Sequence, residues 1–237
     1  MANVLPPVTS LKRIALDLLF PPWCIGCGRE GDYLCGNCRR SLPVIVPPVC
    51  PRCGRPRTPG ASCPGCIEEP ADIDGIRAPF LFDGAIRRAV HELKYRNLRA
   101  LVPALARFLN DYLAENPLPA EVLVPVPLHP RRLRERGYNQ SALLARELGK
   151  LTGLPVVERG FVRHRYVSPQ ARSADVNERR RNVAGAFAGT SPEGLEGRQV
   201  LLIDDVSTSG TTLNACAGVL KSAGAASVWG LTLALEL

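Results

Sequence analysis

Paired cysteines constrain the fold of this 237-residue chain more than any other feature. Eight of the nine cysteines precede residue 67, in four pairs with two residues between the members: Cys24 and Cys27, Cys35 and Cys38, Cys50 and Cys53, Cys63 and Cys66. This spacing lets both thiolates of a pair face one tetrahedral ion, and two pairs complete a site with Zn–S distances of about 2.3 Å. Seven residues separate the first pair from the second and nine separate the third from the fourth, which suits two consecutive zinc ribbons. We therefore predict two structural zinc ions, each held by four cysteines.

The spacing leaves the order of pairing open, because ligation in which the first pair shares a metal with the third fits it too. Disulfides fit poorly in a chain without an export signal, and the regular pairs lack a ferredoxin pattern. A module this small has too few apolar residues for a core of its own, so zinc would be its core. Cys216 stands alone on the apolar face of a predicted helix, and we interpret it as a core residue.

The first twenty residues do not read as a secretory signal. A basic pair at residues 12 and 13 precedes an apolar stretch, but Asp17 interrupts it and no small-residue cleavage site follows. Residues 11–19 instead predict a short amphipathic helix. Apolar stretches elsewhere fall well short of the roughly 20 residues that a bilayer helix needs. We expect a cytoplasmic protein with no membrane insertion.

The character of the sequence changes between Pro70 and Ile76. We place a domain limit there, with a double zinc ribbon of two four-cysteine sites in residues 1–75 and a second domain in residues 76–237. Helical patterns in the second domain cover residues 84–97, 101–115, 139–153 and 211–224, and strand patterns lie within 121–128, 154–165, 198–204 and 226–235. Such alternation is typical of an α/β fold with a parallel sheet and helices on both faces. The long irregular region 163–199 indicates a functional loop.

One segment of the second domain, VLLIDDVSTSGTT at residues 200–212, joins two carboxylates to a run of small hydroxyl residues. We predict that residues 204–210 form the turn at the carboxyl end of a parallel strand, where α/β folds bind ligands. The backbone N–H groups and hydroxyls of residues 208–212 and the dipole of the next helix would point at one phosphate. Asp204 and Asp205 would repel that phosphate, so they should meet a neighbouring group. Ribose hydroxyls fit this position, and so does Mg²⁺.

This segment resembles the 5-phosphoribosyl-1-pyrophosphate (PRPP) signature of type I phosphoribosyltransferases, in which two acidic residues precede a loop rich in threonine and glycine. Three more segments are similar to the ComF family: LKYRN (93–97), VPVPLHPRRLRERGYNQ (124–140) and RYVSPQARSADVNERRRNVAGAF (165–187). The resemblance covers nearly the whole chain. It implies an α/β fold in which a parallel-sheet type I phosphoribosyltransferase (Rossmann-like) domain follows a small N-terminal double zinc-ribbon module. Ser207 departs from related signatures, which often carry a bulkier residue there.

The resemblance also implies roles for individual residues. Asp204 and Asp205 bind the ribose hydroxyls and are the candidate catalytic residues, with Mg²⁺ accompanying PRPP. The 5′-phosphate is held by Thr208, Ser209, Gly210, Thr211 and Thr212, and the pyrophosphate loop is formed by Pro125, Val126, Pro127, Leu128 and His129, with Arg131 beside it. Residues 165–182, which begin at Arg165, match a flexible loop that closes over the substrate. For His129, Arg131 and Lys94, a structural or solvated role stays open.

The net charge of +8 invites a nucleic-acid interpretation. Residues 1–75 are nearly neutral, with eight basic and seven acidic side chains, so the basic excess lies in the second domain. Its clusters at 131–136 and 178–181 fit either a solvated helix face or a counter-field for anionic PRPP.

Two function classes therefore stay open. One is a phosphoribosyltransferase with an unknown acceptor, including one of nucleotide metabolism. The other is a PRPP-binding or PRPP-regulated protein that engages single-stranded or branched DNA. The ComF resemblance implies DNA uptake and natural transformation for this second class, with DNA-uptake or helicase proteins as partners.

Overall fold

The computed structural model describes residues 21–60, 63, 66, 71–158, 162–163, 187–188 and 194–237. The chain divides into two compact units, Met1–Leu42 and Pro43–Leu237. The helix predicted at residues 11–19 and the loop predicted at residues 165–182, with Arg165, lie outside the described residues.

The described part of the first unit, residues 21–42, is organised around cysteines. Its regular elements are α2 (Gly36–Arg40) and an antiparallel bridge between residues 23 and 30. Leu34 is fully buried, and Cys24 and Cys38 are buried as well. So small an apolar core favours a metal as the main support of this fold.

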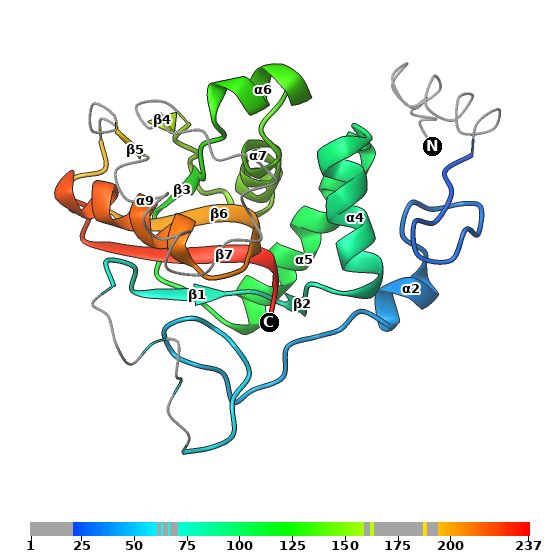
Figure 1. Cartoon of the computed structure of the whole chain (residues 1–237), viewed down its shortest axis with the longest axis horizontal. Coiled ribbons are helices and arrows are strands. Elements are labelled where there is room, and N and C mark those ends of the chain that lie inside the picture. The colour runs from blue at the N-terminus through cyan, green and yellow to red at the C-terminus, as the bar shows by residue number, and fades with distance from the viewer. Residues whose placement is uncertain are drawn as a thin grey trace, which may run out of the picture. The chain divides into compact units, whose positions relative to one another are not determined.

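A parallel sheet forms the centre of the second unit (Figure 1). Its strands run in the order β1 (Gly75–Arg77), β7 (Ser227–Leu235), β6 (Gln199–Ser207) and β3 (Val122–Pro125), and β2 (Phe80–Leu81) pairs with the end of β7. β6 and β7 pair from Gln199 with Ser227 to Ser207 with Leu235. Their nearly continuous apolar sequences are what a strand buried on both faces requires. A separate antiparallel pair joins β4 (Val162–Arg163) to β5 (Phe187–Ala188).

Helices cover both faces of the parallel sheet, as predicted. α9 (Thr211–Ser222) lies on one face, and α5 (Val102–Glu115) and α7 (Gln140–Thr152) lie on the other (Figure 1). The described residues also form α4 (Gly84–Tyr95), the 3-10 turn η1 (Arg99–Leu101) and α6 (Pro130–Arg136). The helix predicted at residues 84–97 is confirmed as α4, and one of its faces is buried, because Ile86, Val90 and Leu93 are at most 1% exposed.

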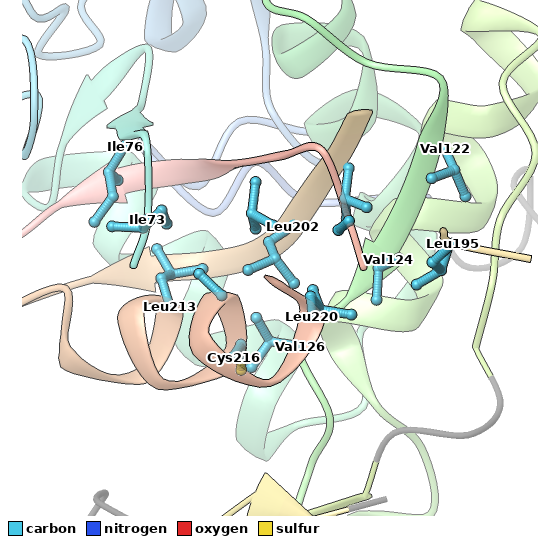
Figure 2. Packing of buried hydrophobic residues seen from close by; sticks show 14 of the residues in the cluster. Ile73, Ile76, Val122, Val124, Val126, Leu195, Leu202, Leu213, Cys216 and Leu220 are labelled. Atoms are coloured by element: carbon cyan, nitrogen blue, oxygen red, sulfur yellow. The ribbon is translucent and has the colours of Figure 1, made fainter. Parts of the chain in front are cut away.

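The core between α9 and the sheet holds the phosphate-loop candidate in place. Leu213, Cys216 and Leu220 of α9 pack with Val124 and Leu202 of the strands, as Figure 2 shows. Full burial of one such leucine contributes roughly 1.5–3 kcal/mol. Cys216 is fully buried, which agrees with its interpretation as a core residue.

The second group of cysteines belongs to the same unit as the sheet. The backbone N–H of Ile76 in β1 donates to the carbonyl of Arg52 at 2.7 Å, and Arg77 Nη1 donates to the carbonyl of Pro51 at 2.8 Å. The domain limit predicted at residues 75 and 76 falls within β1 and stays a prediction. Within the described residues, no helix has the length and apolar character needed to cross a bilayer.

Candidate functional site

The eight paired cysteines form two separate four-sulfur clusters. One cluster joins Cys24, Cys27, Cys35 and Cys38, and the other joins Cys50, Cys53, Cys63 and Cys66, with all ligand atoms of a cluster within 4.8 Å of one another. Neighbouring pairs thus combine, rather than the first pair with the third.

The sulfur separations fit a zinc ion. Cys27 Sγ lies 3.6 Å from Cys35 Sγ, and Cys53 Sγ lies 3.6 Å from Cys63 Sγ. A tetrahedron with Zn–S bonds of about 2.3 Å has edges of about 3.8 Å. Each cluster therefore has the donor set and size of a structural zinc site.

The second candidate site lies where β3 and β6 end. These strands are parallel neighbours, so the loops that follow them meet at one edge of the sheet. The N–H of Val126, just after β3, donates to the carbonyl of Ile203 in β6 at 2.9 Å. β6 continues through Ser207, so Asp204 and Asp205 belong to the strand and the turn is shorter than the predicted residues 204–210. Pairing with β7 extends the strand beyond the apolar run that the sequence shows.

Asp204 presents one oxygen to the protein and keeps the other available. Its Oδ1 accepts hydrogen bonds from Ser141 Oγ at 2.7 Å and from the N–H of Asp205 at 2.9 Å. Its Oδ2 makes no hydrogen bond to any residue in the described part of the chain. Burial and the neighbouring charge of Asp205 raise the pKa of Asp204 to about 6, although Lys94 and Ser141 act in the opposite direction. Serine at position 141, at the start of α7, was not among the predicted site residues.

Asp205 is buried in an ion pair. Only 2% of the residue is exposed, and its Oδ1 lies 2.7 Å from Lys94 Nζ in α4. Its Oδ2 is buried without a hydrogen-bond partner among the described residues. The Lys94 side chain is 18% exposed, so this residue is part of the site and not a solvated charge on the helix surface.

The end of α4 is fixed by a residue of the segment 124–140. Tyr138 Oη donates to the carbonyl of Leu93, and the guanidinium of Arg99 lies 4.3 Å from the centre of the Tyr138 ring. These contacts hold the helix turn that carries Lys94 against the start of α7. The segment LKYRN (93–97) marks Lys94 by its resemblance to the ComF family, but it does not identify the partner of this lysine.

The predicted phosphate loop forms the turn between β6 and α9. Gly210 adopts a φ of 74° directly before the first residue of α9, in the left-handed region that glycine enters at little cost. Ser209 Oγ and Thr211 Oγ1 share a hydrogen bond of 2.7 Å. The unpaired N–H groups at the start of a helix favour an anion, so this turn has the features that a phosphate needs. We call residues 208–212 the phosphate turn.

The predicted pyrophosphate loop follows β3 at the same edge. The carbonyl of Val126 accepts a hydrogen bond from Asn139 Nδ2 at 2.9 Å. The N–H of Arg131 donates to His129 Nδ1 at 3.1 Å, so His129 caps α6. Arg131 also pairs with Glu135 at 2.9 Å on an exposed helix surface. The structure places Pro125 and Val126 beside β6, and it gives both His129 and Arg131 a role in α6 itself.

The second cysteine cluster lies against the phosphate turn. Arg55 Nη2 donates to the carbonyl of Thr208 at 2.7 Å. A pocket of about 120 Å³ is bordered on one side by Arg52, Arg55 and Cys66 and on the other by Thr208, Ser209 and Thr211. Nothing in the sequence around Arg55 indicated this contact, because the two residues are 153 positions apart.

Comparison with known proteins supplies two domain matches and several relatives that match over most of their length. The double zinc ribbon domain matches residues 15–67, and the phosphoribosyl transferase domain matches residues 134–234. Competence protein F of Haemophilus influenzae is 31% identical over 217 residues, which are 85% of this chain and 90% of the relative. The chain belongs to the ComF family.

Other ComF relatives have a similar extent. Competence protein ComFC of Bacillus subtilis is 28% identical over 86% of this chain and 85% of its own length. DNA utilization protein YhgH of Salmonella typhi is 31% identical over 82% of this chain and 87% of its own length. Both domains of this ComF chain are thus present in the order that its sequence predicted: zinc ribbons, then a parallel-sheet phosphoribosyltransferase domain.

Solved structures similar to this ComF chain include two enzymes of purine chemistry. Purine phosphoribosyltransferase from Pyrococcus horikoshii is 19% identical, covers 60% of this chain and 75% of its own, and gives a TM-score of 0.34. The allosteric regulatory enzyme of purine biosynthesis is 24% identical, covers 56% of this chain and 25% of its own, and gives a TM-score of 0.36.

Proposed function

We propose that the edge of the sheet formed by β3 and β6 binds PRPP with Mg²⁺, and that the chain acts in DNA uptake. The observation that carries the proposal is the position of the phosphate turn directly after a strand that ends in two carboxylates. A sugar phosphate needs a site for its anionic phosphate and acceptors for the hydrogen bonds of its hydroxyls. Here both lie next to each other on one β–α connection.

The proposed roles follow from the charges of the ligand. The N–H groups and hydroxyls of the phosphate turn take the 5′-phosphate. Asp204 Oδ2, which has no hydrogen-bond partner in the described part of the chain, accepts from a ribose hydroxyl. Asp205, whose Oδ2 is buried, is the second ribose-binding residue that the resemblance implies. The loop from Pro125 to His129 takes the pyrophosphate, and Arg165, in the loop predicted at residues 165–182, contributes positive charge. Mg²⁺ prefers oxygen ligands, so the pyrophosphate and the carboxylates suit it.

The role in DNA uptake is proposed from the relatives and from charge. Relatives of this chain carry the names competence protein and DNA utilization protein. The net charge of +8 favours contact with single-stranded or branched DNA. DNA-uptake and helicase proteins are the further partners we propose. Free thiolates that bind zinc persist in a reducing compartment, so we place this function in the cytoplasm.

A catalysed phosphoribosyl transfer is the second candidate function, with an unidentified acceptor. The match of residues 134–234 to the phosphoribosyl transferase domain favours it. Incubation of the protein with Mg²⁺, PRPP and a panel of bases tests it by release of pyrophosphate. Release that depends on one base supports transfer, and no release with any base argues for PRPP as a bound regulator.

Calorimetric titration with PRPP and Mg²⁺ tests the proposed site. Asp204→Asn removes a charged acceptor, so we expect PRPP to bind roughly 10- to 100-fold more weakly, with two zinc ions per chain retained. Asp111→Asn, at an exposed position on α5, is the matched control and should bind as the native protein does. Unchanged affinity in the Asp204 variant would refute the assignment of this site.

The salt dependence of binding to single-stranded DNA tests the second part of the proposal. Contacts with phosphates release counterions, so affinity should fall steeply as salt rises from about 50 to 200 mM. Absent or salt-insensitive binding would favour the transferase alone.

A further inference from the structure

The second cysteine ribbon contacts the candidate ligand site, and no role assigned so far explains this contact. Arg55 stands two residues after Cys53 and donates to the carbonyl of Thr208, the first residue of the phosphate turn, at 2.7 Å. Arg55 is neither fully buried nor exposed, so its side chain makes a specific contact between the second ribbon and the phosphate turn and is not a solvated surface charge.

The ribbon holds Arg55 in position from both sides. The carbonyl of Arg55 accepts from the N–H of Cys50 at 2.8 Å, and the N–H of Gly54 donates to the carbonyl of Cys50 at 3.0 Å. These are the bonds of the turn that follows a metal-binding pair of cysteines. The backbone of Arg55 is therefore fixed by the same turn that positions the ligand sulfurs of Cys50 and Cys53.

The sheet holds the ribbon against the phosphate turn. A Cβ atom added to Gly54 would lie 2.5 Å from the carbonyl oxygen of Ile76, which shows how closely the ribbon backbone approaches β1. On its other side, Ile76 Cδ1 would lie 2.8 Å from a Cβ atom added to Gly210. Ile76 thus packs between the ribbon and the phosphate turn, and a shift of either would have to move it.

The hydrogen bond from Arg55 fixes the orientation of a peptide plane. In a trans peptide the carbonyl and the next N–H point in opposite directions. Because the Thr208 carbonyl is directed at the guanidinium, the N–H of Ser209 is directed to the opposite side of the turn. A guanidinium donor makes a stronger hydrogen bond than a neutral one, so it favours this orientation over its flipped alternative.

We propose that Arg55 is a positioning residue: the second cysteine ribbon uses it to hold the phosphate turn in the conformation that binds a sugar phosphate. The identity of the ligand rests on the proposed function, but the effect of Arg55 on the turn does not. The second ribbon then contributes to ligand binding by orienting the N–H of Ser209.

Hydrogen exchange of the ligand-free full-length protein tests the positioning directly. In Arg55→Met, the amide of Asn214, which donates to the carbonyl of Gly210 in the phosphate turn at 2.9 Å, should exchange about tenfold faster than in the native protein. Arg57→Met removes the same charge at an exposed position of the same ribbon and should leave this rate unchanged. Zinc content is measured for both variants, and two ions per chain in Arg55→Met assign the effect to the side chain. Equal exchange rates in the two variants would overturn the proposal.

Ligand titrations separate positioning from a general loss of structure. Arg55→Met should lower the affinity for ribose 5-phosphate about tenfold. Its affinity for Mg²⁺–pyrophosphate, a ligand that lacks the 5′-phosphate, should stay within about twofold of the native value. Arg55→Lys keeps one charged donor and should recover part of the affinity for ribose 5-phosphate. Equal weakening of both ligands would show a structural role only. A native protein that binds neither ligand would refute the proposed function, while the exchange experiment would still decide the role of Arg55.

Discussion

At the scale of single residues, the two adjacent aspartates have different environments. Asp204 is bound by Ser141 and keeps one oxygen for a ligand, whereas Asp205 is buried against Lys94. Attraction in a buried ion pair offsets the cost of removing both charges from water only while both partners are present. The two carboxylates therefore differ in how they respond to mutation and to pH.

Loss of Lys94 should destabilise the second unit strongly. Lys94→Met leaves the carboxylate of Asp205 buried without a counter-charge, which typically costs about 3–5 kcal/mol. Unfolding in urea, followed by the fluorescence of Trp229, measures this loss. Lys150→Met is the control, because its pair with Glu147 is exposed and should contribute less than about 1 kcal/mol. Similar losses in the two variants would contradict a buried, paired Asp205.

The raised pKa of Asp204 predicts the sign of a pH effect. Burial and the charge of Asp205 raise this pKa to about 6 from an ordinary value of 3.8, so the folded protein binds the proton more tightly than the unfolded chain does. The contribution of Asp204 to the free energy of unfolding should be greatest below about pH 4 and fall as the pH rises to about 6. The difference in unfolding free energy between the native protein and Asp204→Asn, measured from about pH 4 to 7.5, isolates this group. A difference that stays constant or rises with pH would show that the pKa is not raised.

At the scale of elements, the connection from β6 to α9 joins a rigid strand to a helix through a very short turn. The sequence predicted both elements, because the apolar run and the helical period are local patterns. It placed the turn too early, since the carboxylates and Ser207 have no apolar character to mark them as strand residues. Their strand conformation comes from pairing with β7, and Ser207 opposite Leu235 is the last such pair.

Gly210 is a residue of this connection at which a substitution should be costly. Gly210→Ala would place a Cβ atom 2.8 Å from Ile76 Cδ1 and force a side chain into a φ of 74°. Gly153→Ala is a matched control, because Gly153 ends α7 with a φ of 76° and has nothing within 4 Å of its added Cβ. In both variants the free energy of unfolding should fall by roughly 1–2 kcal/mol because of left-handed strain. In Gly210→Ala it should fall by at least about 1 kcal/mol more because of the clash. Equal losses in urea unfolding would show that Ile76 yields without cost.

At the scale of the whole molecule, local patterns predicted the parts but not their contacts. Cysteine spacing predicted two metal sites, and alternating elements predicted the parallel sheet with helices on both faces. β1 escaped prediction because three residues are too few to show a period. Lys94 with Asp205 and Arg55 with Thr208 escaped because each pair joins distant segments, and one sequence carries no record of which charge meets which acceptor. The least predictable part of the site is thus the part supplied by other elements.

The two metal clusters should therefore differ in their effect on ligand binding. Metal analysis should find two zinc ions in the native protein and one in either Cys27→Ser or Cys63→Ser, because each cluster has its own four sulfurs. Cys63 belongs to the ribbon that carries Arg55, whereas Cys27 lies in the other compact unit. Cys63→Ser should speed exchange of the Asn214 amide, which donates to Gly210 of the phosphate turn, and weaken binding of ribose 5-phosphate, since the ribbon loses the metal that supports its fold. Cys27→Ser should leave both quantities close to native. If the Cys27 variant changed them as much, the second ribbon would have no special hold on the phosphate turn, and the contact from Arg55 would not be its route.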